Sequence, residues 1–276
     1  CGRIEPDLAQ QFMRLIALWY FAFDARARAA SRAFLSRVFG RPATAGEVYQ
    51  HILRFARVTL DRVFLLLGAR GFVVNRTGHH YLETLTRERR GAVLLGAHLG
   101  SFEAMRAGAR HESLPLNIVG HFENARMINA LLSRLNPHAT ARVVHVGKDP
   151  VGFAMQVSER LAQGELVAIL ADRVGLNDKQ ISVSFLGQQA SFPTGPFLLA
   201  ALLKCPVYLV FGLYFEPNRY ELFCEPFAER IELPRKQREQ ALRDVVQKYA
   251  ERLEHYARQA PDNWFNFYDF WKSEAS

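Results

Sequence analysis

The first third of the chain has the apolar spacing of amphipathic helices. Between positions 8 and 39, apolar residues recur every three or four positions, which is the period of a helix with one apolar face. These residues are Leu8, Phe12, Leu15, Trp19, Phe23, Ala30, Phe34 and Val38. After a turn at 40–46, a second stripe follows at Val48, Ile52, Phe55 and Val63. The pattern predicts one or two helices over 8–39 and another helix after the turn.

From about position 91, short apolar runs alternate with helix-like stretches. The runs are AVLL (92–95), LNIVG (116–120), ARVVHV (141–146), LVAIL (166–170) and CPVYLVFGLY (205–214). The helix-like stretches lie around 101–110, 124–135, 151–162 and 195–204. Near-continuous apolar strands are typical of a sheet that is covered on both faces. The alternation therefore predicts an α/β fold with a mostly parallel central sheet flanked by helices.

The last part of the chain adds a strand, a long helix and an aromatic run. RYELFCEPF (219–227) is strand-like, and the helix after it carries an apolar stripe that predicts a cover for the core. The stripe is Leu242, Val245, Tyr249, Leu253 and Tyr256. The chain closes with PDNWFNFYDFW (261–271), whose aromatic rings have to pack somewhere. We expect one domain over 1–276, with an N-terminal helical region at 1–68 and an α/β core at 91–260.

Composition favours a folded protein with acidic partners. Of the 276 residues, 49% are apolar, and the net charge is +8, so a nucleic acid, an anionic membrane or an acidic carrier protein would be attracted. The three cysteines are too scattered for a disulfide framework, which points to a reducing compartment. LIALWYFAF (15–23) is far shorter than the ~20 apolar residues that span a membrane, and the start lacks the features of a secretory signal.

Arginines accompany the N-terminal apolar stripe, at Arg26, Arg28, Arg32, Arg37 and Arg41. A basic helix rich in aromatic residues can lie in an anionic membrane interface, with its arginines on the headgroups. The same helix can also pack on its own domain and expose a solvated basic face. The two interpretations are compatible, and both stay open.

The chemistry is expected in GAVLLGAHLGSFEAMRAG (91–108). A buried strand delivers His98 to the carboxyl end of the sheet, where open α/β folds bind ligands. Gly100 permits a tight turn, and Ser101 can cap a helix whose first turn holds Glu103. A carboxylate on one ring nitrogen fixes the histidine tautomer, so the other nitrogen can take a proton from a substrate hydroxyl. The segment therefore predicts a base, His98, oriented by Glu103.

GAHLGSFE (96–103) resembles the hallmark of the bacterial lipid A biosynthesis (late) acyltransferases, within the lysophospholipid-acyltransferase-like superfamily. That hallmark is a histidine followed by four residues and an acidic residue. HFENARMINALLSR (121–134) is similar to the family's second block. Positions 161–207 resemble its third and fourth blocks. Pro261 and Trp264 fit a C-terminal signature, but NFYDFW (266–271) replaces its usual basic pair, which leaves the subfamily open.

The resemblance implies transfer of a fatty acyl chain from an acyl carrier protein, or from coenzyme A, to a hydroxyl of a lipid A precursor or a related amphiphile. It places the protein at the cytoplasmic face of the bacterial inner membrane, either peripherally or through an anchor outside this chain. No metal or cofactor is expected. In this interpretation backbone N–H groups near Gly100 and Ser101, at the helix start, stabilise the oxyanion.

Three further residues are candidates for substrate binding. Arg126, in the second block, could hold a phosphate or simply be solvated. Asp172 and Arg173 directly follow the strand at 166–170, so in a parallel sheet they share an edge with His98. The SFPTGP turn (191–196) is either part of the acyl or headgroup pocket or a plain loop.

Alternative functions remain. Within the same class, the acceptor could be an aryl polyene, an ornithine lipid or a glycolipid. A hydrolase would pass the acyl group to water, but the chain has no Gly-x-Ser-x-Gly nucleophile elbow. A basic peripheral-membrane or nucleic-acid-binding protein without catalysis would explain the charge. It would leave the strand, histidine, turn and glutamate without a role, and no nucleic-acid motif is present.

Overall fold

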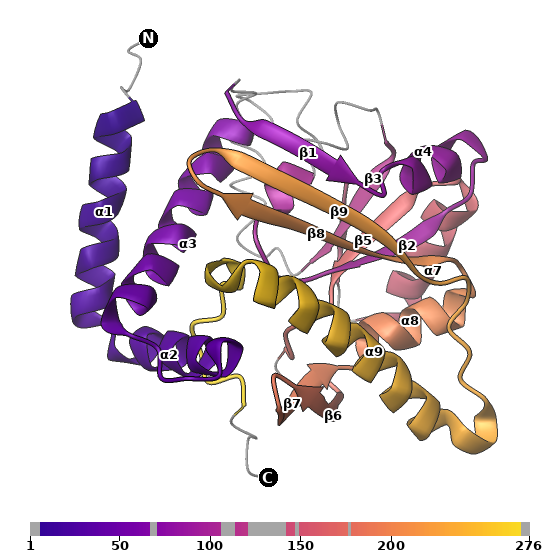
Figure 1. The fold of residues 1–276 in the computed structure, drawn as a ribbon. Coiled ribbons are helices and arrows are strands. Elements are labelled where there is room, and N and C mark those ends of the chain that lie inside the picture. Colours follow the sequence, from indigo (N-terminus) through magenta and orange to yellow (C-terminus); the bar gives the residue numbers. More distant parts are fainter. Residues whose placement is uncertain are drawn as a thin grey trace.

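The computed structural model describes residues 6–66, 71–105, 114–120, 142–146, 149–175 and 178–271. Three N-terminal helices, α1 (Pro6–Phe23), α2 (Ala25–Phe39) and α3 (Ala45–Leu66), stand at one side of an α/β sheet (Figure 1). The α/β prediction is confirmed, and so are the helices predicted before position 68.

The central sheet has the strand order β1-β9-β8-β2-β5-β3-β4. Its strands are β1 (Val73–Thr77), β2 (Ala92–Gly96), β3 (Leu116–Gly120), β4 (Arg142–His145), β5 (Leu166–Leu170), β8 (Val207–Phe215) and β9 (Arg219–Ala228). Neighbouring strands are parallel, except that β8 and β9 form an antiparallel hairpin. The sheet is thus mostly parallel, as predicted.

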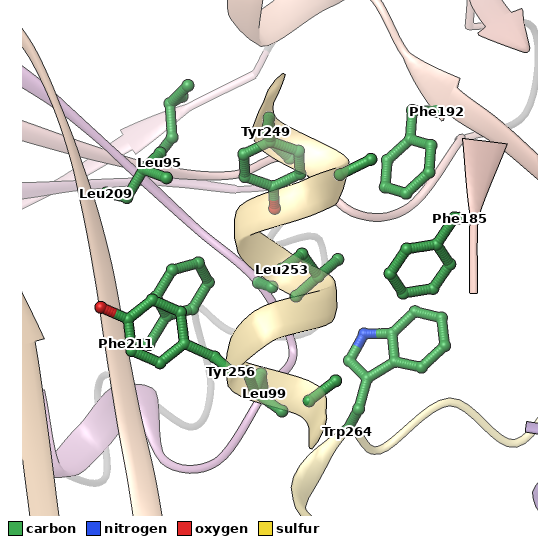
Figure 2. Close-up of a cluster of buried hydrophobic side chains, with 14 of the residues drawn as sticks. Leu95, Leu99, Phe185, Phe192, Leu209, Phe211, Tyr249, Leu253, Tyr256 and Trp264 are labelled. Carbon is green, nitrogen blue, oxygen red and sulfur yellow. The ribbon is translucent and has the colours of Figure 1, made fainter. Parts of the chain in front are cut away.

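Helices cover both faces of the sheet. On one face, Val93 and Leu95 of β2 join a core with Tyr249 and Leu253 of α9 (Arg238–Gln259), the cluster that Figure 2 shows. On the other face, Leu94 packs in a smaller core with α4 (His80–Arg87). Further helices are α7 (Pro150–Ala162) and α8 (Gly195–Leu203). Alternate residues of a buried strand face opposite cores, so both faces of β2 are apolar.

Two predicted apolar stripes lie wholly or partly on the surface. On α1, Phe12, Leu15, Trp19 and Phe23 are all exposed, and the helix buries Ala17 instead. On α3, Val48 and Ile52 are buried as expected, but Phe55 and Val63 are exposed. The helices form as predicted, but helical spacing alone does not say what covers an apolar face.

Four elements were not predicted, namely the helix α4 and three strands. β1 is a short, largely exposed edge strand. β6 (Gln180–Phe185) and β7 (Gln188–Pro193) form a separate antiparallel hairpin. Its turn uses Leu186 and Gly187, both with positive φ. Leucine is rare in that conformation. The turn has Leu-Gly where most tight hairpins have Asn-Gly or Asp-Gly, so the sequence gives no typical hairpin signal.

The closing aromatic run packs into the core. After η3 (Pro261–Asn263), Trp264, Phe265 and Phe270 are buried. Trp264 makes edge contacts with Phe34 of α2 and Phe185 of β6, at centroid distances of 4.9 and 5.3 Å. The C-terminal segment therefore joins the N-terminal helices to the α/β part of the chain.

Candidate active site

The register of the sheet brings His98 and Asp172 together. β2 and β5 are parallel, with Gly96 opposite Leu170, and each of the two side chains lies two residues beyond that pair. The Nδ1 atom of His98 lies 2.9 Å from Oδ1 of Asp172. The backbone N–H of His98 donates to Oδ2 of the same carboxylate at 3.0 Å. The carboxylate thus holds the histidine through both ring and backbone.

Asp172 is fully buried yet charged. Burial alone would raise its pKa, but the neighbouring His98, the guanidinium of Arg173 and the indole N–H of Trp264 together lower the pKa below its ordinary value. The indole nitrogen donates to Oδ2 at 2.9 Å. The carboxylate is therefore ionised at neutral pH, and it can stabilise a protonated imidazole. The imidazole itself is 33% exposed, so its Nε2 is the nitrogen left for a substrate.

Glu103 does not take the predicted position on the ring nitrogen. Its Oε2 lies 2.9 Å from Nε of Arg62 on α3, an ion pair without hydrogen-bond geometry. The predicted pairing of His98 with Glu103 is therefore corrected, because Asp172 occupies Nδ1. The physical reason is tertiary: the turn after His98 directs the start of the next helix towards α3, while the parallel strand β5 delivers a carboxylate directly to the imidazole.

The turn after His98 is held by backbone contacts. Gly100 has φ +74°, and a Cβ there would lie 1.9 Å from the carbonyl oxygen of Gly212, so only glycine fits. The N–H of Gly100 donates to the carbonyl oxygen of Asn263 at 2.8 Å, and the N–H of Ser101 donates to the carbonyl oxygen of Gly212 at 2.7 Å. The N–H groups of Gly100 and Ser101 are therefore occupied, so these two are not the oxyanion donors predicted near this turn. The predicted cap is confirmed, since Oγ of Ser101 accepts from the N–H of Ala104.

The other predicted substrate residues differ in placement. Asp172 has no exposed surface, and its carboxylate contacts His98. Arg173 is partly buried, and its Nη2 donates to the carbonyl of Phe265 at 2.6 Å, while its Nε has no hydrogen-bond partner in the described structure. Arg126 lies outside the described residues. Thr194 donates its hydroxyl to the carbonyl of Lys179 and makes no side-chain cap for α8.

An apolar pocket opens beside the turn that follows His98. Phe102 and Met105 form one wall, and Leu94, Ala168 and Val210 form its floor on the sheet. The pocket is partly open to solvent. Searched over the described ranges, the chain has no cluster of three or more His, Cys, Asp or Glu that could hold a metal ion.

Sequence reasoning missed the contribution of Trp264. Its indole reaches Asp172 from 92 residues further along the chain. Trp264 fits a C-terminal family signature, but nothing in its local sequence indicates a polar contact.

Comparison with known proteins identifies the family. The model for bacterial lipid A biosynthesis acyltransferases matches residues 4–273, which is nearly the whole chain. No curated protein matches the chain. A histidine with a buried carboxylate at the carboxyl end of a parallel sheet, beside an apolar pocket, agrees with the acyl transfer for which the family is named. The chain belongs to the bacterial lipid A biosynthesis acyltransferase family.

Proposed function

We propose that the protein is an O-acyltransferase in which His98 is the general base and Asp172 its orienting carboxylate. The observation that carries the proposal is the contact between Nδ1 of His98 and the buried Asp172. It holds the imidazole in one tautomer and leaves Nε2 to accept a proton. The donor is a fatty acyl thioester of acyl carrier protein or coenzyme A, and the acceptor is a hydroxyl of a lipid A precursor or a related amphiphile.

The reaction follows from these groups. Nε2 of His98 takes the proton of the acceptor hydroxyl as its oxygen attacks the thioester carbonyl carbon. The tetrahedral intermediate then collapses, the carbon–sulfur bond breaks, and the imidazolium returns the proton to the leaving thiolate. Asp172 stays ionised throughout and stabilises the imidazolium. An acceptor phosphate would suit Arg173, whose guanidinium lies next to this pair in sequence and keeps unpaired N–H capacity.

We place the fatty chain of the donor in the apolar pocket beside Phe102 and Met105. The pocket is lined mainly by aliphatic and aromatic side chains. Phe102, in its wall, follows His98 by four residues. A concave apolar site next to a few polar groups is what an acyl chain requires. The thioester carbonyl at the end of the chain would then lie near the imidazole.

The floor of the pocket gives a testable chain-length prediction. Ala168 of β5 is buried and lines the floor, so Ala168→Leu adds three carbon atoms inside it. We expect the preferred acyl chain to become shorter by about two to four carbons. The measurement is competition among acyl carrier protein thioesters of eight to sixteen carbons. Ala200→Val, on the α9 side of the sheet, is the matched control, and an unchanged preference in Ala168→Leu would place the chain elsewhere.

We propose that the exposed face of α1 lies on an anionic membrane. Four large apolar side chains of this helix, Phe12, Leu15, Trp19 and Phe23, are each more than half exposed. Arg14 and Arg26 are exposed nearby. Such a face buries itself in the headgroup region while arginines bind the lipid phosphates. Among the described residues, no helix is long and apolar enough to cross a membrane.

Charge on this face should release the protein from lipid. Leu15→Asp combined with Trp19→Asp is expected to weaken sedimentation with vesicles containing phosphatidylglycerol by at least about tenfold, because two apolar contacts of 1.5–3 kcal/mol each are lost. Leu202→Asp is the control, since Leu202 on α8 is 67% exposed and far along the chain. Equal binding by the double variant and the control would argue against α1 as the membrane face.

The reaction itself is tested with labelled substrates. The protein is incubated with radiolabelled lauroyl acyl carrier protein, phosphatidylglycerol vesicles and a tetra-acylated lipid A precursor, and the lipids are analysed by mass spectrometry. We expect a product heavier than the precursor by one acyl chain. Release of free fatty acid without acylated lipid would indicate a hydrolase. Acylation of a total bacterial lipid extract, but not of the lipid A precursor, would indicate a different amphiphilic acceptor.

A further inference from the structure

We infer that Trp264 is a positioning residue for Asp172, and that Ser31 and His51 hold Trp264 in place from the N-terminal helices. The inference rests on the proposed function and deepens it, because it explains what holds the Asp172 carboxylate against His98. It rests on three consecutive hydrogen bonds that join α2, α3, the C-terminal segment and the end of β5.

The indole completes the set of donors around Asp172. Oδ1 of the carboxylate binds the imidazole of His98, while Oδ2 accepts both the backbone N–H of His98 and the indole N–H of Trp264. A fully buried carboxylate is costly unless its oxygens are hydrogen-bonded. Trp264 supplies a donor without adding a charge, so the imidazole is left as the titrating partner of Asp172.

The indole is fixed by its packing. Trp264 has no exposed surface, and Phe34, Phe185 and Phe270 contact its ring at centroid distances of 4.9, 5.3 and 4.9 Å. Figure 2 shows the indole nitrogen on the side of the ring that faces Leu253 of α9. Edge contacts from three aromatic rings leave the indole little freedom to rotate. Its N–H is therefore held at one point.

The backbone of Trp264 is held by a buried histidine. Nε2 of His51 lies 2.9 Å from the Trp264 carbonyl, and Nδ1 of His51 lies 2.8 Å from the hydroxyl of Ser31. Burial lowers the pKa of His51 to about 4, so the ring is neutral near pH 7. A carbonyl can only accept, so Nε2 carries the hydrogen, and Ser31 donates to Nδ1. The three hydrogen bonds thus point the same way: Ser31 donates to His51, His51 donates to the Trp264 carbonyl, and the Trp264 indole donates to Asp172.

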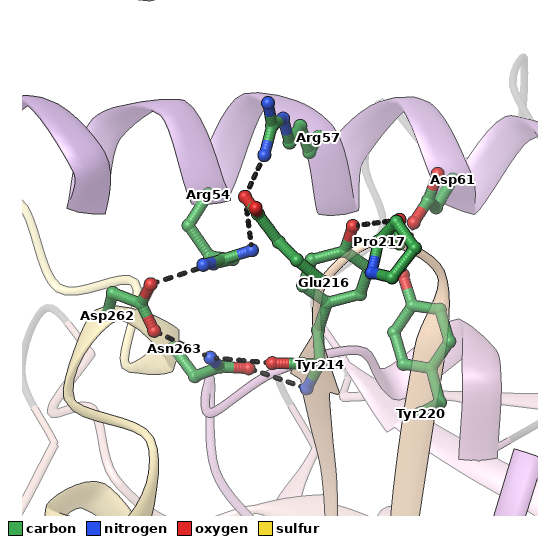
Figure 3. Close-up of polar contacts among 9 residues, drawn as sticks. All are labelled: Arg54, Arg57, Asp61, Tyr214, Glu216, Pro217, Tyr220, Asp262 and Asn263. Atoms are coloured by element: carbon green, nitrogen blue, oxygen red, sulfur yellow. Dashed lines mark hydrogen bonds and ion pairs between the residues drawn. The ribbon is translucent and has the colours of Figure 1, made fainter. Parts of the chain in front are cut away.

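Neighbouring contacts fasten the same segment to the sheet. Asn263 forms two hydrogen bonds with the backbone of Tyr214, at 2.7 and 3.1 Å, and Asp262 pairs with Arg54 of α3 at 2.8 Å. Figure 3 shows this network below α3. Phe265 donates its N–H to the carbonyl of His98 at 3.0 Å. The segment 262–265 is thereby fixed on both sides of Trp264.

The direct test is Trp264→Phe, which keeps an aromatic ring and removes the N–H donor. Using lauroyl acyl carrier protein with the lipid A precursor, we expect kcat to fall by about ten- to a hundredfold, as is usual for the loss of a supporting hydrogen bond. KM should change less than twofold. The acid limb of the pH–rate profile should move to higher pH, because a carboxylate that lacks the indole donor binds the imidazole proton more strongly.

Trp271→Phe is the matched control. Trp271 belongs to the same aromatic cluster, but its indole donates to the carbonyl of Phe185 at 3.4 Å and makes no bond to Asp172. We expect its kcat and pH profile to stay within twofold of the wild type. If Trp264→Phe folds poorly, 3-benzothienylalanine at position 264 replaces the N–H by sulfur and keeps the shape. Wild-type kcat in that protein would overturn the inference.

Two further measurements separate this inference from the proposed function. In an Asp172→Asn background, Trp264→Phe should have little additional effect on kcat, because the two residues act through one contact. An undiminished effect would show that Trp264 does not act through Asp172. The pH midpoint of the His98 ring signals, followed by NMR, should also rise in Trp264→Phe. That midpoint reports the contact even if acyl transfer does not depend on His98, and an unchanged midpoint would contradict the inference.

Discussion

Replacing His98 by alanine is expected to lower kcat/KM for acyl transfer by at least about a thousandfold, with the fold and vesicle binding unchanged. The imidazole is the group in the site that can accept the hydroxyl proton near neutral pH, and general bases typically contribute 10²–10⁴-fold. The side chain is partly exposed, so its removal leaves no large buried cavity. Labelled lauroyl acyl carrier protein and the lipid A precursor provide the measurement.

His255→Ala is the control for this substitution. His255 lies on the exposed side of α9 and bonds only to Gln259 in the described structure, so activity should be unchanged. The circular dichroism spectrum of both variants should match that of the wild type. Transfer by His98→Ala at the wild-type rate would remove the histidine from the chemistry and with it the proposed mechanism.

Asp172→Asn should be nearly as damaging, with a loss in kcat of about 10³–10⁴-fold. The amide keeps the size of the side chain, but it removes the charge that stabilises the imidazolium and disturbs the tautomer. Glu103→Gln is the informative comparison, because Glu103 pairs with Arg62 and not with His98. We expect a loss of about tenfold or less there. A larger loss in Glu103→Gln than in Asp172→Asn would reverse the assignment of the orienting carboxylate.

Asp172→Asn should also change how the stability of the folded protein depends on pH. The folded-state pKa of Asp172 is lowered, so the carboxylate stabilises the fold fully above its unfolded pKa of ~3.9 and loses this contribution as the pH falls through the lower folded value. The difference in Tm between wild type and Asp172→Asn should therefore be constant from pH 8 to about pH 5 and shrink below about pH 4. A difference that grows on acidification would contradict the assigned direction.

The strands were predictable because their signal is local. β3 and β5 have the predicted bounds, 116–120 and 166–170, since both are short continuous apolar runs between polar turns. β6 carries an alternating pattern, with Ile181, Val183 and Phe185 inward. Half of its residues are polar, and its turn has no typical turn sequence, so the hairpin was missed.

The candidate site was predictable only in part, because its partners are joined by tertiary contacts. His98 could be found from a buried strand followed by glycines. The choice between Glu103 and Asp172 could not be made, because it depends on the register of β2 against β5, in which Gly96 faces Leu170. The role of Trp264 depends on where a C-terminal segment packs. Neither property is encoded in the spacing of neighbouring residues.

The place of Trp264 after His98 and Asp172 along the chain has a consequence for synthesis. The donor that completes the Asp172 site is residue 264, and the histidine that holds it is residue 51. A ribosome therefore releases His98, Asp172 and the strands that carry them before it releases Trp264, which follows Asp172 by 92 residues. The nascent chain can assemble its sheet during translation, but the pair of His98 and Asp172 reaches its final arrangement only after Trp264 has also been released.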